Sequence, residues 1–157
     1  MSIPVIEEAG DIRIFGLGSP GGKGAGLIQV NRITIPRVAK LKTRVLATSF
    51  YDGFLRNGRT LESEALPLVA SILEEFGNGP LGVRSSATNE AGRETASAGP
   101  LHTGENISFM LPNNHPDPAV RRFQAARAIE CIYLDFLRKQ DASSPEKMAI
   151  VINPIPG

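Results

Sequence analysis

The sequence predicts an α+β fold, in which strands and helices mix without the strict alternation that a parallel βαβ sheet requires. Short apolar runs with strand character are spread from Ile12 to Ile152, and several segments between them carry the apolar spacing of helices. The length of 157 residues is enough for one domain with a substantial core and hardly for two. We therefore expect a single unit with a mixed or antiparallel sheet and flanking helices.

The first half of the chain predicts strands and short helices around one glycine-rich loop. In order these are a strand at 12–15, the loop at 16–24, a short helix at 25–30, an extended stretch to 36, a strand at 44–47, and helices at 50–55 and 63–76. Pro36 disfavours helix at the residue before it. Thr48 or Ser49 is expected to cap the helix at 50–55, and Gly77 is expected to end the stronger helix.

The second half predicts further strands and the longest helix. In order these are a strand at 81–83, a strand at 107–111, a helix from 118 and a strand at 148–152. Small polar residues dominate 89–104, so we expect a mobile surface loop there. Asp117 as N-cap and Pro118 at the first helical position start the long helix. Its apolar stripe from Ile129 to Leu137 should face the core, and Cys131, among these positions, should be buried.

Composition and charge are those of an ordinary globular protein. Hydrophobic residues make up 41% of the chain, charged residues 21%, and the net charge is +1. Nucleic-acid and membrane-surface binding both normally need clustered positive charge, so we expect neither partner. The first residues have neither a basic start nor a long apolar run, so we expect no signal peptide or membrane span. The single Cys131 excludes an internal disulfide and fits a reducing cytoplasm.

The glycine-rich loop Gly16–Gly24 is the first candidate site. Glycines let backbone N–H groups approach anionic oxygens, and Lys23 adds a positive charge. The loop formally contains G-x-G-x-x-G, but no acidic residue follows about 20 positions later to hold a ribose, so we reject a dinucleotide fold. The P-loop pattern fails too, because Leu17 stands where it needs a glycine and Gly24 where it needs a hydroxyl. A plain glycine-rich turn remains the alternative.

A second candidate site is Val83-Arg84-Ser85-Ser86-Ala87-Thr88, which places an arginine at the expected end of a strand beside three hydroxyl residues. The guanidinium is a rigid fork of donors that matches phosphate oxygens, and the hydroxyls can add to it. Taken alone, the hexamer is more typical of a surface strand end whose arginine has a partner.

Together, Gly21–Leu27, Ile35-Pro36 and Val83–Thr88 resemble, in order and separation, the N-terminal ATP-binding domain of pyruvate phosphate dikinases and phosphoenolpyruvate synthases. Leu111–Pro118 looks like a subgroup described as pyruvate- and phosphoenolpyruvate-binding domain proteins. The resemblance runs from about Phe15 to the end of the chain. It implies a nucleotide-binding domain of the ATP-grasp type, of which residues 1–157 would be a single, incomplete N-terminal subdomain.

The resemblance also implies a set of nucleotide-binding residues. Lys23 and Arg84 match the cations that face the phosphates, and Gly99 lies where the family has an Ala-Gly pair in a loop that closes over them. The set is completed by residues beside these positions: Gly22, Gly24, Ser85, Ser86 and Thr103. The physical logic is that two fixed cations and a loop of N–H groups neutralise a polyphosphate. No catalytic residue and no metal ligand is assigned.

The family's phosphotransferase reaction needs parts that this sequence does not supply. Its members take the magnesium-binding carboxylates and part of the adenine pocket from a second, C-terminal subdomain. They pass the phosphoryl group through a histidine on one further domain to pyruvate on another. Neither His102 nor His115 resembles that phosphohistidine motif. We therefore expect ATP and Mg²⁺ as cofactors, the remaining domains as partners in cis or in trans, a cytoplasmic location, and no activity from this chain alone.

Several departures from the family pattern favour an alternative function. Ala91 replaces a usual acid, and Pro100 and Leu101 replace usual glutamines. A further departure, Asn153 where the last strand should carry a glutamine, puts turnover in doubt more than the fold. The alternative is a stand-alone, non-catalytic protein that binds a nucleotide or phosphorylated metabolite, or that pairs with a partner chain.

Overall fold

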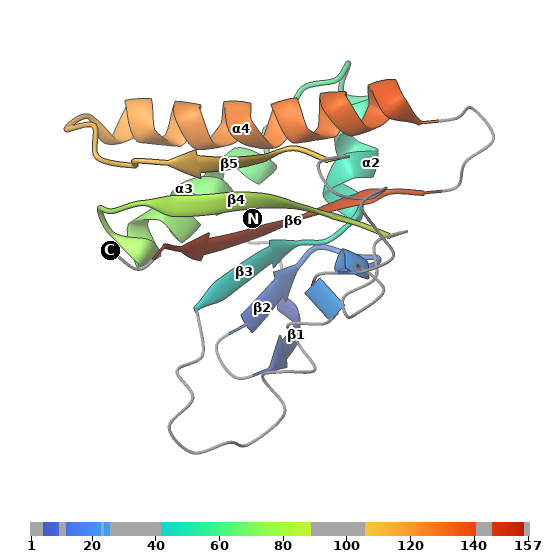
Figure 1. The fold of residues 1–157 in the computed structure, drawn as a ribbon, viewed down its shortest axis with the longest axis horizontal. Helices are drawn as coiled ribbons and strands as arrows, with labels where there is room; N and C mark the ends of the chain where they lie inside the picture. The colour runs from blue at the N-terminus through green and yellow to red at the C-terminus, as the bar shows by residue number, and fades with distance from the viewer. Residues whose placement is uncertain are drawn as a thin grey trace.

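The computed structural model describes residues 12–22, 24–25, 42–88, 106–140 and 146–155, together with the backbone of 5–9. Within these residues, one six-stranded mixed sheet is flanked by helices, which confirms the α+β class (Figure 1). The strands are β1 Val5–Ala9, β2 Ile12–Phe15, β3 Thr43–Leu46, β4 Leu81–Ala87, β5 Ser108–Leu111 and β6 Met148–Pro154. The helices are α2 Ser49–Arg56, α3 Ala65–Phe76 and α4 Pro118–Lys139.

The order of strands across the sheet is β1-β2-β3-β6-β4-β5. β2 and β3 run parallel, and each of the other neighbouring pairs is antiparallel. The strand that comes last along the chain, β6, therefore lies between β3 and β4 near the middle of the sheet. This position explains why 148–152 are all apolar and buried, because that part of the strand has neighbours on both edges and cover on both faces.

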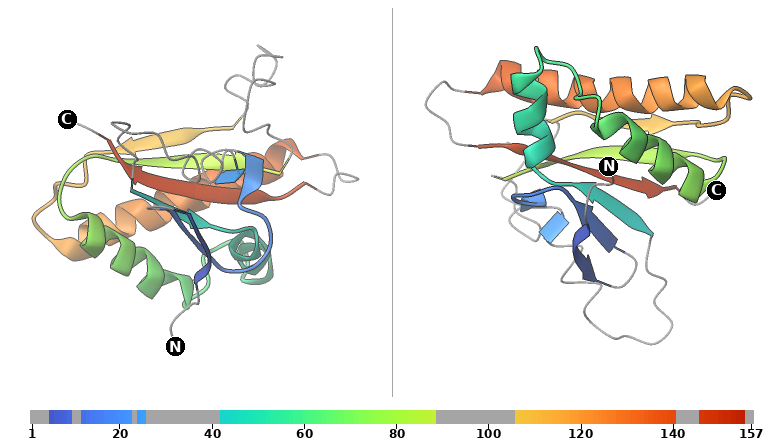
Figure 2. Two further views of the ribbon diagram at one scale, coloured as in Figure 1. Left: turned by 90° about the horizontal axis from the view of Figure 1, so that it is seen from below. Right: turned by 180° about the vertical axis from the view of Figure 1, so that it is seen from behind.

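One face of the sheet is covered by α2, α3 and α4 (Figure 2). The predicted stripe of α4 is buried there, with Ile129, Ile132, Tyr133 and Phe136 each less than 5% exposed. Aromatic rings from α2 meet this stripe, since Tyr51 packs edge-on against Tyr133 with ring centroids 5.4 Å apart. Asp117 caps α4 as predicted, its carboxylate accepting from the Ala119 N–H, and Pro118 follows it.

The opposite face carries a smaller apolar cluster and the glycine-rich loop. The cluster consists of alternate residues of three adjacent strands: Ile12, Ile14, Val45, Ala47, Ala149 and Val151. The loop residues 21–22 and 24–25 lie on this side, away from the helices (Figure 2). A side-chain carbon added at Gly24 would lie 3.7 Å from Cγ1 of Val45, so the loop is in close contact with the sheet.

Two expectations about element ends were wrong. β4 does not stop at Val83 but continues through Arg84 to Ala87, because β6 pairs with it residue by residue from Leu81–Pro154 to Ala87–Met148. Thr48 precedes α2 in the N-cap position but makes no side-chain capping bond there. The expected segments at 26–36 and 89–104 lie outside the described residues. Strand β1 was not anticipated from the sequence.

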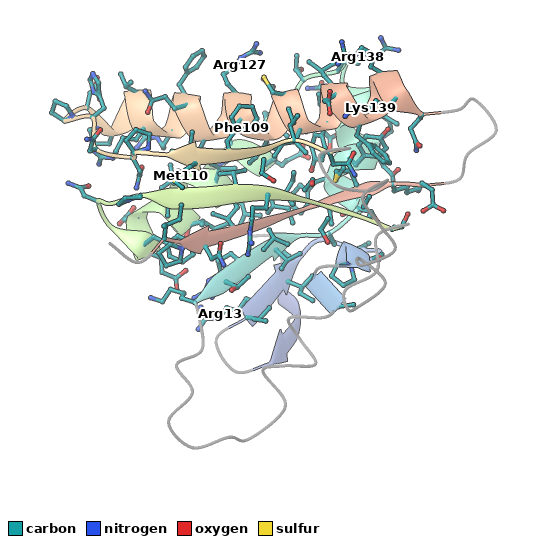
Figure 3. The ribbon with its side chains drawn as sticks, in the orientation of Figure 1. Arg13, Phe109, Met110, Arg127, Arg138 and Lys139 are labelled. Carbon is teal, nitrogen blue, oxygen red and sulfur yellow. The ribbon has the colours of Figure 1, made fainter. Side chains whose placement is uncertain are left out.

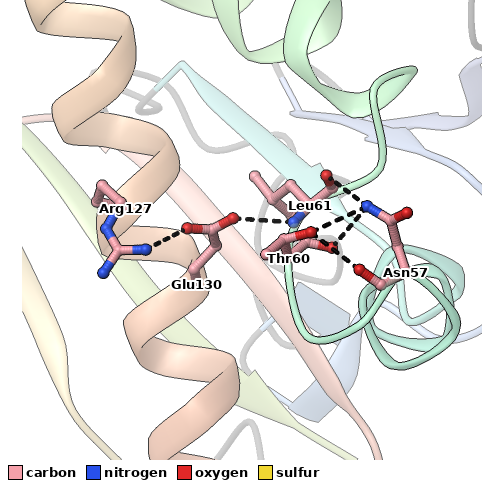
Figure 4. Close-up of polar contacts among 5 residues, drawn as sticks. All are labelled: Asn57, Thr60, Leu61, Arg127 and Glu130. Carbon is pink, nitrogen blue, oxygen red and sulfur yellow. Dashed lines mark hydrogen bonds and ion pairs between the residues drawn. The ribbon is translucent and has the colours of Figure 1, made fainter.

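Two polar contacts fix α3 and the loop before it. The buried Arg44 of β3 donates from Nε to Oε1 of Glu75 in α3 over 2.9 Å. Hydrogen bonding from Arg44 lowers the pKa of Glu75, and the nearby charges of Arg44, Arg13 and Lys42 lower it further. Glu130 of α4 accepts from the Leu61 N–H at 2.9 Å and holds the chain between α2 and α3 (Figure 4).

Candidate functional site

The two candidate segments lie together on the face opposite the helices. Side chains alternate along β4, so Arg84 and Ser86 share one face while Ser85 points to the other. The cross-strand partners agree, because Arg84 lies opposite Val151 and Ser86 opposite Ala149, both members of the smaller cluster. Ser85 lies opposite Ile150, which belongs to the helix-covered core.

Ser86 holds one end of the glycine-rich loop against β4. Its Oγ accepts a hydrogen bond from the Gly24 N–H at 3.1 Å and donates one to the Pro20 carbonyl at 2.9 Å. Gly21 lies directly on the strand, since a side-chain carbon there would be 1.9 Å from the Ser86 carbonyl oxygen. Arg84 and Ser86 are about 7 Å apart along the strand. The loop is therefore attached to β4 two residues along the strand from Arg84.

Hydroxyls at the start of α2 hold the other end of the loop. The Leu17 N–H donates to Ser49 Oγ at 2.8 Å, and the Ser19 N–H donates to Thr48 Oγ1 at 3.1 Å. In return, the Thr48 N–H donates to the Ser19 carbonyl and the Ser49 N–H to the Leu17 carbonyl. These bonds explain why Thr48 does not cap α2: its hydroxyl is committed to the loop rather than to its own helix.

A hollow of about 460 Å³ opens on the same face at the β4–β5 side of the sheet. It has a cationic part at Arg84 and an apolar part that includes Met110 of β5, which is 71% exposed. Phe109 and Met110 are labelled on β5 in Figure 3. The remaining lining residues come from β4, β5 and the end of β6: Gly82, Ser108, Phe109, Asn153, Pro154 and Ile155.

Arg84, one of the residues that line this hollow, also has an unsatisfied donor. Its Nε is buried, and within the described part of the chain it has no hydrogen-bond partner. A buried guanidinium nitrogen without an acceptor costs free energy, because it has lost its bonds to water. Such a donor is the kind of group that an anionic oxygen would satisfy.

The sequence-predicted site residues fall into three groups. Gly22, Gly24 and Ser86 lie with Arg84 on the face of the sheet that carries the loop. Ser85 lies on the helix-covered face, so this geometry gives no support to its predicted role. Three further residues, Lys23, Gly99 and Thr103, lie outside the described residues.

Sequence reasoning did not identify β5 as part of the wall of the hollow, nor the hydroxyls of Thr48 and Ser49 as the groups that hold the loop. Met110 could have been found, because strand alternation places it on the same face as Ser108, which pairs with Arg84. Thr48 and Ser49 were noticed only as helix caps, and no local pattern distinguishes a capping hydroxyl from one that binds a distant loop.

Other candidate groups take structural positions. His115 lies in the turn before α4, where its Nδ1 accepts from the Asp117 N–H at 3.0 Å. Cys131 is partly exposed on α4 rather than buried.

In the described ranges, no group of three or more His, Cys, Asp or Glu side chains could hold a metal ion. None of the helices described has the length and apolar character needed to cross a bilayer.

Comparison with known proteins adds no assignment: no protein-family model matches this chain, and no curated protein matches it. The resemblance to the dikinase and synthase family therefore stays a prediction that rests on the motifs quoted above.

Proposed function

We propose that this chain is the N-terminal, ATP-binding part of a module like those of phosphoenolpyruvate synthases and pyruvate phosphate dikinases. The nucleotide phosphates would lie on the open face of the sheet, between Arg84 and the docked glycine-rich loop. The single observation that carries the proposal is that Arg84, which lines the hollow two residues along β4 from the loop's attachment at Ser86, has a buried Nε without a partner in the described part of the chain.

The chemistry of the hollow suits a ligand with one anionic and one apolar part. Arg84 offers charge-assisted hydrogen bonds to phosphate oxygens. Met110 and Ile155 offer apolar surface for a planar base. The resemblance adds Lys23 as a second cation and assigns magnesium binding to a C-terminal subdomain. Because half of such a cleft is contributed by that subdomain, the chain alone should bind MgATP weakly and should not transfer phosphate.

The proposal is tested by titrating the ¹⁵N-labelled chain with MgATP and following the amide resonances by NMR, a method suited to weak binding. Shifts are expected at Gly82, Arg84 and Met110, with little change on the outer surface of α4. Arg84→Gln should remove most of these shifts. Arg138→Gln is the matched control, because Arg138 projects from α4 on the helix-covered side (Figure 3) and its side chain is 77% exposed.

Two results would change the conclusion. If Arg84→Gln responds to MgATP as the parent does, the site is wrong. If the parent binds MgATP in the micromolar range, the alternative of a stand-alone nucleotide- or phosphometabolite-binding protein is favoured, because the chain would then hold a complete site.

A further inference from the structure

We infer that Ser86 and Ser49 are positioning residues, whose hydroxyls hold the two ends of the glycine-rich loop in place for the ligand without touching it. This inference deepens the proposed function and rests on it. It also revises the role that the sequence motif suggests for Ser86, which is direct contact with phosphate.

The first reason is that the one proton that the Ser86 hydroxyl can donate is already used in a hydrogen bond. A serine hydroxyl has one proton to donate, and Ser86 gives it to the Pro20 carbonyl. The same oxygen accepts from the Gly24 N–H. The side chain is fully buried between the strand and the loop. A phosphate oxygen accepts hydrogen bonds and needs a donor, so it could bind Ser86 only by displacing the loop.

The second reason is that the loop is held by hydroxyls at both ends. Besides Gly24, the N–H groups of Leu17 and Ser19 are bonded to Ser49 and Thr48, and the Gly21 N–H is bonded to Ser19 Oγ. These N–H groups are not available to a ligand in this conformation. What these bonds provide is a fixed backbone position for Leu17, Ser19 and Gly21, and for Gly24 beside β4.

The third reason is the contrast with the neighbouring serine. Ser85 is as deeply buried as Ser86, but its Oγ has no hydrogen-bond partner in the described part of the chain. Ser85 and Ser86 are therefore equally buried on the same strand, and they differ in whether the hydroxyl is hydrogen-bonded to the loop. Ser85→Ala is accordingly a matched control for Ser86→Ala.

The test combines amide hydrogen exchange with MgATP titration of the parent, Ser86→Ala and Ser85→Ala. In Ser86→Ala, exchange of the Gly24 amide should become about tenfold faster, which is the scale of one lost hydrogen bond. The buried amides of α3 should keep their parent rates, and affinity for MgATP should fall by about tenfold. Ser85→Ala should leave both the Gly24 exchange rate and the affinity unchanged.

Ser49→Ala provides an independent variant, useful if Ser86→Ala does not fold. It removes the acceptor of the Leu17 N–H, and neither Ser49 nor Leu17 lines the hollow. Faster Leu17 exchange with weaker binding would therefore show that the position of the loop, rather than contact, sets affinity.

The inference is overturned if the Gly24 amide exchanges at the parent rate in Ser86→Ala. It is also overturned if that amide is released while MgATP affinity stays the same, or if Ser85→Ala weakens binding as much as Ser86→Ala. A parent chain that binds no MgATP overturns the proposed function instead, and the exchange rates alone then decide whether these hydroxyls hold the loop.

Discussion

The two faces of the sheet are covered in different ways. On one face, α2, α3 and α4 bury large apolar and aromatic side chains such as Phe54 and Tyr133. On the other, a glycine-rich loop is attached through backbone groups and small hydroxyls, with Ser86 at one end. The first kind of contact is broad and non-directional, whereas the second depends on a few hydrogen bonds of defined geometry.

This difference separates stability from binding. Most of the apolar area that stabilises the chain is buried under the helices. Among the candidate site residues that the structure describes, only Ser85 lies on that face. The loop face carries the hollow and Arg84, whose Nε has no acceptor among the described residues. Substitutions under the helices should therefore change mainly the free energy of unfolding, whereas those where the loop meets β4 should also change the position of the loop. The predictions below test this division, from the largest expected effect to the smallest.

The largest effect is expected where the loop touches the strand. Gly21→Ala would place a carbon 1.9 Å from a backbone oxygen of β4, at a φ of +75° that L-residues rarely adopt. Steric overlap and backbone strain together should cost about 4 kcal/mol, or should release the loop from the sheet. Denaturant unfolding and the exchange rate of the Gly24 amide measure the two outcomes.

Gly58→Ala is the matched control for that substitution. Gly58 has a similar φ of +69°, but an added carbon there meets nothing within 4 Å. Only the conformational cost of about 1 kcal/mol should remain. Equal losses from the two variants would mean that contact with β4 contributes nothing.

The next effect concerns the ion pair under the helix face. Glu75→Gln removes the carboxylate that pairs with the Arg44 guanidinium, which is 1% exposed. Breaking a buried pair is costly, but Glu75 is about one-third exposed, so we expect a loss of about 2 to 3 kcal/mol in the free energy of unfolding. Chemical denaturation at neutral pH measures it, with the outer-face Arg138→Gln expected to be nearly neutral.

The same pair predicts how stability depends on pH. Hydrogen bonds from Arg44 lower the pKa of Glu75 in the folded protein. The pair's contribution is therefore complete above the ordinary carboxyl pKa of about 4.3 and is lost as pH falls through the lowered folded-state pKa. Glu75→Gln should lose less stability than the parent over this acidic range. Parallel pH profiles for the two proteins would contradict the assignment.

A smaller effect is expected for the contact between α4 and the segment after α2. Glu130→Ala removes the acceptor of the buried Leu61 N–H, which should cost about 1 to 2 kcal/mol (Figure 4). Arg127→Ala removes the other partner of Glu130, but Arg127 is about half exposed, so the loss should stay below about 1 kcal/mol. Thermal unfolding of the two variants should rank them in this order.

The smallest effect is expected at Tyr133. Its hydroxyl is buried without a hydrogen-bond partner in the described structure, and burial raises the pKa of the phenol. Tyr133→Phe keeps the ring contacts and removes an unsatisfied polar group, so stability should be unchanged or slightly higher. A loss of more than about 1 kcal/mol on denaturation would indicate that the hydroxyl has a partner after all.

The helix-covered face was the more predictable one. The stripe of α4 and the Asp117-Pro118 start follow from periodicity and capping, which are local properties of the sequence. The continuation of β4 through Arg84 was not predictable, because it depends on pairing with β6, more than sixty residues away. The roles of Thr48, Ser49 and Ser86 were not predictable either, because their hydroxyls bond to a segment that is distant in the sequence. A hydroxyl carries no periodic signal that would indicate such a bond.

Strand β6 has a consequence for how the chain reaches this fold during synthesis. It is the last described strand to leave the ribosome, yet it joins β3 to β4. Until it emerges, β2–β3 and β4–β5 are separate ribbons with unpaired edges at which other nascent chains could add. Completion of the sheet is therefore a late event, and we expect ribosome-stalled chains to resist protease only after 148–154 are outside the exit tunnel.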